Sequence, residues 1–104
     1  MKILVLAGAE QDMVEAVDYY NRQKPGLGRK FSEEVRKTFD LIAAFPEAWP
    51  RFSQGSRRCL VDRFPYGVAY QVDEGSVLIA AVMHLKRDPR RWQEALNARL
   101  GDGK

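Results

Sequence analysis

Cysteine and histidine each occur only once in this 104-residue chain, which limits the chemistry that it can carry. The single cysteine, Cys59, excludes an internal disulfide and any metal site built from several thiolates. The single histidine, His84, is predicted to lie on a different strand from Cys59, so the spacing typical of zinc ligands is absent. We therefore expect no metal ion and no cofactor.

Long apolar runs are also missing. The run from Ile3 to Ala7 is too short for the core of a signal peptide, and no segment approaches the ~20 apolar residues of a membrane-spanning helix. The glycine-containing stretch from Pro25 to Gly28 lies between two predicted helices, whereas a phosphate-binding loop follows a strand. We therefore expect a soluble, cytoplasmic protein without a nucleotide-binding loop.

Positive charge is concentrated in the second half of the chain. Residues 1–50 hold seven Lys and Arg against eight Asp and Glu, whereas residues 51–104 hold ten against six. A basic half favours a negatively charged partner, such as nucleic acid, an acidic protein segment or an anionic ligand. Solubility alone is the other explanation. The length predicts one domain, placed at residues 1–100, and a frayed tail at residues 101–104.

Apolar periodicity predicts a strand and two helices in the first half. A β-favouring run at residues 3–7 ends at Gly8, and a helical stripe then spans residues 9–23. A second helix begins at Gly28 and ends at Pro46, because proline cannot continue a helix. Only Pro-Gly-Leu-Gly joins the two helices, so we expect an antiparallel hairpin. The stripe of the second helix consists of Leu27, Phe31, Val35, Thr38, Ile42 and Phe45.

The second half predicts three strands and a terminal helix. Residues 57–63, 66–73 and 76–84 are β-like, and the third run is apolar on both faces, as in a central strand. Asp73-Glu74-Gly75 is typical of a hairpin turn, and Asp88-Pro89 of a helix start. The predicted fold is α+β in the order β-α-α-β-β-β-α, with a helical hairpin packed on a small, mainly antiparallel sheet.

Cations near the strand ends are the candidate partner-binding residues. Guanidinium groups suit phosphate or carboxylate because they form two parallel hydrogen bonds and stay charged. If the late strands form one sheet, two groups of cations converge, and Tyr66 and Trp92 add stacking surfaces. Alternatively, the cations are ordinary solvated charges and Trp92 fixes the terminal helix. The candidates are Arg57, Arg58, Arg63, Lys86, Arg87, Arg90, Arg91 and Trp92.

His84 is the candidate for acid or base catalysis, because histidine is the side chain that most readily gains or loses a proton at neutral pH. The alternative is a structural role, in which one hydrogen bond fixes the path of the chain as it leaves the last strand. The residues themselves leave both roles open.

Short motifs follow one another in a characteristic order along most of the chain. They are Ala16-Val17-Asp18-Tyr19-Tyr20, Pro25-Gly26-Leu27-Gly28, Phe31, Ile42, Pro46, Arg63-Phe64-Pro65-Tyr66, Val68, Tyr70, Ala81-Val82, His84, Arg87, Pro89 and Trp92. No single motif is specific, but their order and spacing resemble the ParE/RelE superfamily of toxins from bacterial type II toxin–antitoxin (plasmid stabilisation) modules. The expected order of strands and helices also agrees with that toxin fold.

The resemblance implies a toxin that a cognate antitoxin holds inactive, typically by wrapping it with an acidic segment. ParE-like members poison DNA gyrase and carry out no chemistry, whereas RelE-like members are endonucleases that cut mRNA on the ribosome. In the second case the catalytic residues would be His84, Arg87, Arg63 and Tyr66. A homodimer and a heterotetramer with the antitoxin are both compatible with the resemblance.

The sequence departs from the RelE-like pattern, because Tyr66-Gly67-Val68 stands where those toxins usually carry an arginine. The preceding loop, Glu47 to Ser56, has Arg51 in place of a lysine-rich set. His84 and Arg87 keep the nuclease alternative open. The motifs of the hairpin are more ParE-like, so we predict a gyrase poison with no favoured catalytic residue. We expect its hairpin, residues 9–45, and the basic strand end to contact gyrase, while the antitoxin covers the sheet and the terminal helix. An antitoxin partner that has lost its toxicity is the third alternative.

Overall fold

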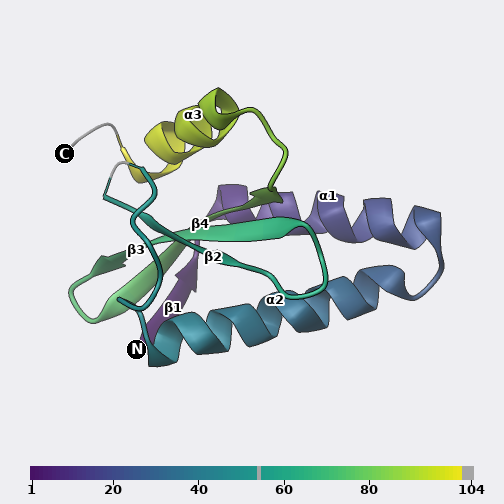
Figure 1. Ribbon diagram of the computed structural model, residues 1–104, viewed down its shortest axis with the longest axis horizontal. Helices are drawn as coiled ribbons and strands as arrows, with labels where there is room; N and C mark the ends of the chain where they lie inside the picture. Colours follow the sequence, from purple (N-terminus) through teal and green to yellow (C-terminus); the bar gives the residue numbers. More distant parts are fainter. Residues whose placement is uncertain (54, 102–104) are drawn as a thin grey trace.

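Three layers make up the computed structural model, which describes residues 1–53 and 55–101 (Figure 1). A four-stranded sheet lies between a helical hairpin and a single helix. The predicted α+β class and the order β-α-α-β-β-β-α are confirmed. The elements are β1 (Lys2–Val5), α1 (Ala7–Gln23), α2 (Leu27–Ala44), β2 (Arg57–Leu60), β3 (Tyr66–Asp73), β4 (Ser76–His84) and α3 (Pro89–Leu100). Of the predicted frayed tail, residues 102–104 lie outside the described residues.

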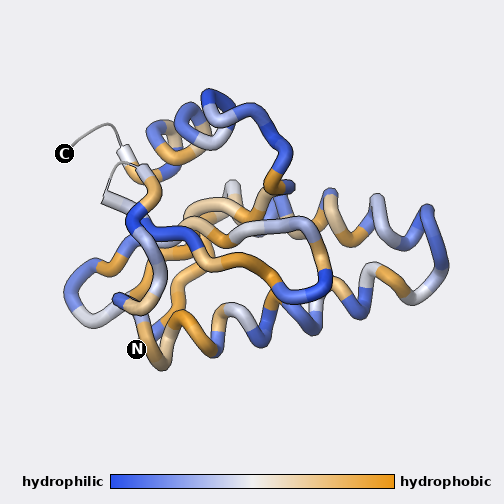
Figure 2. The backbone as a smooth tube through the Cα atoms, viewed as in Figure 1, coloured by the Kyte–Doolittle hydropathy of each residue, from blue (hydrophilic) through white to orange (hydrophobic). Residues whose placement is uncertain are grey.

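The sheet has the strand order β1-β4-β3-β2. β3 runs antiparallel to β2 and β4, whereas β1 is parallel to β4, so the sheet is mainly antiparallel as predicted. In β4, Val77 and Ile79 pack with the hairpin, while Ala81 and Met83 pack with α3. Coverage on both faces explains why the sequence of β4 is apolar throughout. Figure 2 shows this hydrophobic interior and the hydrophilic connection from β4 to α3.

Two glycines shape the α1–α2 hairpin. Gly26 has a φ of 91°, in the left-handed region that favours glycine. At Gly28 an added Cβ would lie 2.6 Å from the Val17 carbonyl oxygen, so a side chain would push the helices apart. The Gly28 N–H instead donates to Asn21 Oδ1 at 2.9 Å. The short connection therefore allows close antiparallel packing, as the sequence predicted.

Three predicted boundaries differ from the structure. β1 ends at Val5 and α1 begins at Ala7, so Gly8 lies inside the helix, where an added Cβ would overlap the Arg99 side chain. β2 ends at Leu60 instead of Arg63, because Arg63 has a φ of 70° and the chain turns back towards β3. Phe45 was predicted to continue the buried stripe of α2, but it follows the last helical residue and is exposed.

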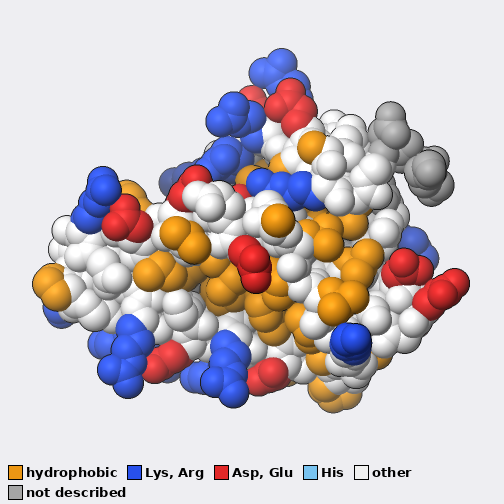
Figure 3. Space-filling model, turned by 180° about the vertical axis from the view of Figure 1, so that it is seen from behind, with side chains coloured by type: hydrophobic (Ala, Val, Ile, Leu, Met, Phe, Trp, Pro, Cys, Tyr) orange, Lys and Arg blue, Asp and Glu red, His pale blue; other side chains and the backbone are white. Residues whose placement is uncertain are grey.

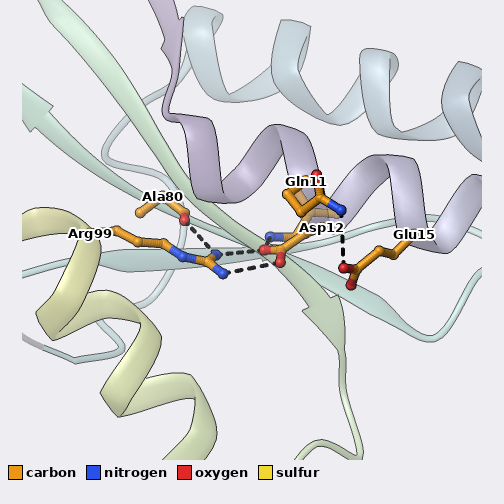
Figure 4. A network of polar contacts seen from close by, with 6 residues as sticks. Gln11, Asp12, Glu15, Ala80 and Arg99 are labelled. Atoms are coloured by element: carbon orange, nitrogen blue, oxygen red, sulfur yellow. Dashed lines mark hydrogen bonds and ion pairs between the residues drawn. The ribbon is translucent and has the colours of Figure 1, made fainter.

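A pair of charged side chains joins α1, β4 and α3 (Figure 4). The Arg99 guanidinium donates to both carboxylate oxygens of Asp12, at 2.6 and 3.1 Å, and to the Ala80 carbonyl at 3.0 Å. Asp12 also accepts the Val82 N–H at 3.0 Å. The Ala80 carbonyl and the Val82 N–H lie beyond the end of β1, beside a β-bulge at which Ala69 pairs with Ala81. The two side chains therefore satisfy a strand edge that β1 does not reach.

Cys59 faces the core, and burial raises the pKa of its thiol to about 11. Because the thiolate is the reactive form, we expect iodoacetamide at pH 8 to leave Cys59 unmodified until urea unfolds the protein. Mass spectrometry after timed labelling measures this. Rapid labelling of the folded protein would contradict the buried position. The unfolded thiol ionises first, near 9.0, so its contribution lowers stability as the pH rises from 9.0 to about 11.

Candidate partner-binding surfaces

The end of β4 brings three of the predicted nuclease residues into one corner. Tyr66, at the start of β3, pairs with His84, and the two ring centroids lie 5.3 Å apart. Arg87 lines the same cavity of about 210 Å³ as Tyr66. Burial raises the pKa of the Tyr66 hydroxyl, and the charge of Arg87 partly opposes this shift. Arg63 lies elsewhere, with its Nε 4.0 Å from Glu34 on α2 and 3.9 Å from Asp62.

The hydrogen bonds of His84 fix the path of the backbone just after β4. Its Nδ1 accepts the Lys86 N–H at 3.0 Å, and its carbonyl accepts the Arg87 N–H at 3.0 Å. The ring therefore fixes the turn that follows β4, in agreement with the structural alternative. With Nδ1 accepting this bond, the proton of a neutral ring is on Nε2.

The cations of β2 point to different faces of the sheet. The Arg57 guanidinium donates to the Trp49 carbonyl at 2.7 Å. Arg58 lies on the α3 side, where its Cζ is 4.2 Å from the centroid of the Phe52 ring and 5.0 Å from that of Trp92. Gly67 makes this path possible, because an added Cβ there would lie 3.0 Å from Arg58 Cδ. Of the three cations around β2, Arg58 contacts Trp92 of α3, whereas the contacts of Arg57 and Arg63 are with Trp49, Glu34 and Asp62.

The second basic group lies between β4 and the first turn of α3. Asp88 caps the helix, with its Oδ1 accepting the Arg90 N–H at 2.8 Å. This bond and the Arg90 guanidinium hold the pKa of Asp88 below its usual range. Lys86, Arg87 and Arg91 form no ion pair with a described residue, and all three are exposed. This segment therefore presents a compact positive surface beside the His84 corner.

Trp92 is only 1% exposed, so it offers no stacking surface to a partner. Its ring packs edge-on against Phe52 at a centroid distance of 5.2 Å, together with Ala81 and Leu96. Trp92 therefore has the structural role that was one of its two predicted alternatives: it fixes α3 on the sheet. Its indole N–H is buried and has no hydrogen-bond partner among the described residues.

An open groove on the hairpin was not predicted from the sequence. It has a volume of about 720 Å³, and Figure 3 shows a broad hydrophobic area with charged side chains around it. Val14 of α1 lines this groove and is 62% exposed. A lone apolar residue on the outer face of the helix was the available signal. The groove is lined by Val5, Glu10, Met13, Val14, Val17, Asp18, Asn21, Ser32 and Phe39.

The described residues hold neither a metal-binding cluster nor a membrane-spanning helix. Within residues 1–53 and 55–101, no group of three or more His, Cys, Asp or Glu side chains is arranged to hold a metal ion. Across the same residues, each helix is too short or too polar to span a bilayer.

Comparisons with known proteins point in one direction. A family model described as the ParE toxin of type II toxin-antitoxin system, parDE, matches residues 3–89. A solved structure of the chromosomal ParDE toxin–antitoxin system from P. aeruginosa has a TM-score of 0.73. The match covers 81% of this chain and 95% of that chain at 17% sequence identity, which shows a shared fold. No curated protein sequence matches significantly. Apart from Pro89, α3 lies beyond the residues that the family model matches.

Proposed function

The chain belongs to the ParE toxin family of type II toxin–antitoxin systems, and from this premise we propose that it poisons DNA gyrase by binding. The observation that carries the proposal is the family match over residues 3–89. The protein then needs no chemistry of its own, and a cognate antitoxin neutralises it by occupying its surface.

The positions of the polar side chains support binding over mRNA cleavage. Cleavage requires a base, an acid and a cation that stabilises the charge on phosphorus, all around one phosphate. Tyr66, His84 and Arg87 share a corner, but Arg63 lies beside Glu34, and one nitrogen of His84 is already bonded to the backbone. The four residues of the predicted nuclease set are therefore not all gathered around one phosphate, because Arg63 lies outside the corner.

Both faces of the sheet are covered within the chain, by the hairpin and by α3. From the sequence we expected the antitoxin to cover the sheet, but neither face of the sheet is open to it. The hairpin groove is the better site, because its apolar floor of Met13, Val17 and Phe39 fits the apolar face of an amphipathic helix. Glu10 and Asp18 on its rim favour cations on that helix.

The exposed cations Lys86, Arg87, Arg90 and Arg91 are then the surface proposed to meet gyrase on DNA. Guanidinium groups suit the phosphates or carboxylates that such a complex presents. This assignment keeps the basic strand end as the expected gyrase contact but not the hairpin, whose open surface is a groove with an acidic rim.

We expect DNA synthesis to fail before protein synthesis when the chain is induced alone in bacterial cells. Pulse-labelling of both processes in the first minutes measures this, and supercoiling by purified gyrase should stop when the protein is added in excess. The variant with Arg90 and Arg91 replaced by alanine should inhibit less, whereas Arg22→Ala, which removes an exposed charge on α1, is the matched control. Unaffected supercoiling would contradict the proposal.

The second candidate function is a ribosome-dependent endonuclease, favoured by the shared corner of Tyr66, His84 and Arg87. It predicts that protein synthesis fails first and that His84→Ala abolishes toxicity in a protein that still folds. A gyrase poison predicts that His84→Ala remains toxic. If the intact, folded chain is harmless in cells, neither function holds, and the protein is an antitoxin partner without toxicity.

A further inference from the structure

Positive charge is concentrated in residues 86–91, the basic connection between β4 and α3. Its six residues hold four cations and one acid, Asp88, which leaves a net charge of +3. The whole chain has the same net charge, so the charges of all other residues cancel. Figure 3 shows Lys and Arg side chains gathered where α3 begins in Figure 1. This end of the molecule therefore attracts a negatively charged partner. The four cations are Lys86, Arg87, Arg90 and Arg91.

Hydrogen bonds hold the backbone of the basic connection in one shape. His84 Nδ1 accepts the Lys86 N–H, and the His84 carbonyl accepts the Arg87 N–H, each at 3.0 Å. The Asp88 side chain then accepts the Arg90 N–H at 2.8 Å and caps α3. Because this backbone is already ordered, little conformational entropy is lost when a partner binds.

Most of this charge has no partner within the protein. Lys86, Arg87 and Arg91 are exposed and form no ion pair with residues 1–53 or 55–101. Arg90 pairs with Asp88 at 3.3 Å, but both side chains are largely exposed, and such pairs contribute little. All four cations can therefore turn to an external anion.

The composition of this surface favours a phosphate backbone over an acidic protein segment. Among the described residues, the exposed large apolar side chains all lie at or before Val72. α3 instead buries its Trp92 and Leu96. The centre of a protein interface is usually aromatic and apolar, whereas DNA phosphates bind cations by releasing condensed ions and need no apolar contact. The basic connection therefore has the composition of a DNA-binding surface.

Glu15 limits this surface on the side of α1. It lines the cavity of about 210 Å³ together with Arg87, Tyr19 and Tyr66. Glu15 is exposed, so its carboxylate would repel a phosphate that entered the cavity. A phosphate backbone is therefore expected to pass over residues 86–91 and to stay outside the cavity.

We propose that the basic connection binds the phosphate backbone of duplex DNA directly, so that the toxin contacts the DNA held by gyrase as well as the enzyme. Phosphate contacts position a protein on DNA but do not read its sequence, so binding is independent of base sequence. The inference rests on the proposed function, because it names the part of the gyrase–DNA complex that meets these cations.

Binding of a short fluorescent duplex to the chain, without gyrase, tests the inference. We expect the dissociation constant from fluorescence anisotropy to rise on the order of 50-fold between about 50 and about 200 mM salt, because about three phosphates are neutralised. In NMR spectra of the ¹⁵N-labelled chain, the duplex should shift the backbone signals of residues 84–92. Shifts confined to the α1–α2 hairpin would overturn the inference.

Three variants separate local charge from net charge. Arg91→Gln removes one unpaired cation and should weaken duplex binding about fivefold at low salt, with a salt dependence smaller by about one released ion. Arg29→Gln, which removes an exposed charge on α2, is the matched control and should bind normally. Glu15→Gln removes the repelling carboxylate and should strengthen binding about twofold. Equal losses for Arg91→Gln and Arg29→Gln would mean that only net charge matters, and the inference would be wrong.

An acidic protein segment is the competing partner. A poly-glutamate peptide that binds residues 86–91 more tightly than the duplex would overturn the inference in favour of such a segment. If the chain stops supercoiling by gyrase but does not bind the duplex at about 50 mM salt, the inference fails and the proposed function stands. If it binds the duplex and supercoiling continues, the DNA-binding surface is supported and gyrase poisoning is contradicted.

Discussion

Replacing Asp12 with alanine is expected to lower the free energy of unfolding by about 3–5 kcal/mol. The Asp12 carboxylate accepts two hydrogen bonds from Arg99 and one from the Val82 N–H. The side chains of Asp12 and Arg99 are only 12% and 23% exposed, so solvent cannot replace these bonds well. The variant would leave a guanidinium and a backbone donor without their acceptor. Urea unfolding followed by circular dichroism measures the loss.

Asp18→Ala is the matched control for this prediction. It also removes an aspartate of α1 that pairs with an arginine, but both side chains are largely exposed, so the change should stay within about 0.5 kcal/mol. Replacing both members of the buried pair, Asp12→Leu with Arg99→Met, should recover part of the loss, because no buried charge remains alone. A loss below ~1 kcal/mol for Asp12→Ala would mean that water reaches the pair freely.

Phe31→Ala is expected to cost about 3–5 kcal/mol. Phe31 is fully buried, and its ring centroid lies 5.3 Å from that of Tyr20, 5.2 Å from Phe64 and 4.9 Å from Tyr66. The substitution removes the central ring of a cluster that joins both hairpin helices to the start of β3. Thermal and urea unfolding measure the effect.

Phe45→Ala removes the same side chain from an exposed position and should change stability by no more than about 0.5 kcal/mol. Equal effects at both positions would contradict the packing described here. Because Tyr66 borders the His84 corner, Phe31→Ala should also shift the NMR signals of His84, whereas Phe45→Ala should leave them in place.

Local sequence patterns were sufficient where the structure depends on neighbours in the chain. β3, β4 and the turn at Glu74-Gly75 have the predicted residues, because alternation and a glycine with positive φ determine them locally. The start of α1 was not predicted, because Gly8 is helical where Arg99 of α3 packs against it. A local sequence pattern cannot predict a contact between residues as far apart in the chain as Gly8 and Arg99.

The candidate sites also divide into those that neighbouring residues form and those that require contacts between distant parts of the chain. The sequence identified the residues of the β4 end, since His84 and the cations around it are adjacent in the chain. It did not reveal the hairpin groove, which requires the spacing between two helices. It left two roles for Trp92, and burial of the ring decided between them.

The order in which the residues of this chain are translated has a consequence for the folding of the newly made protein. Asp12 and Arg99 lie 87 positions apart, and β1 has no partner until β4 has been synthesised. Folding that depends on such distant contacts is slow and finishes late. The hairpin groove, in contrast, is built from residues at or before Phe39. The surface proposed for the antitoxin is therefore translated well before the cations proposed to meet gyrase, so an antitoxin already present in the cell encounters its site first.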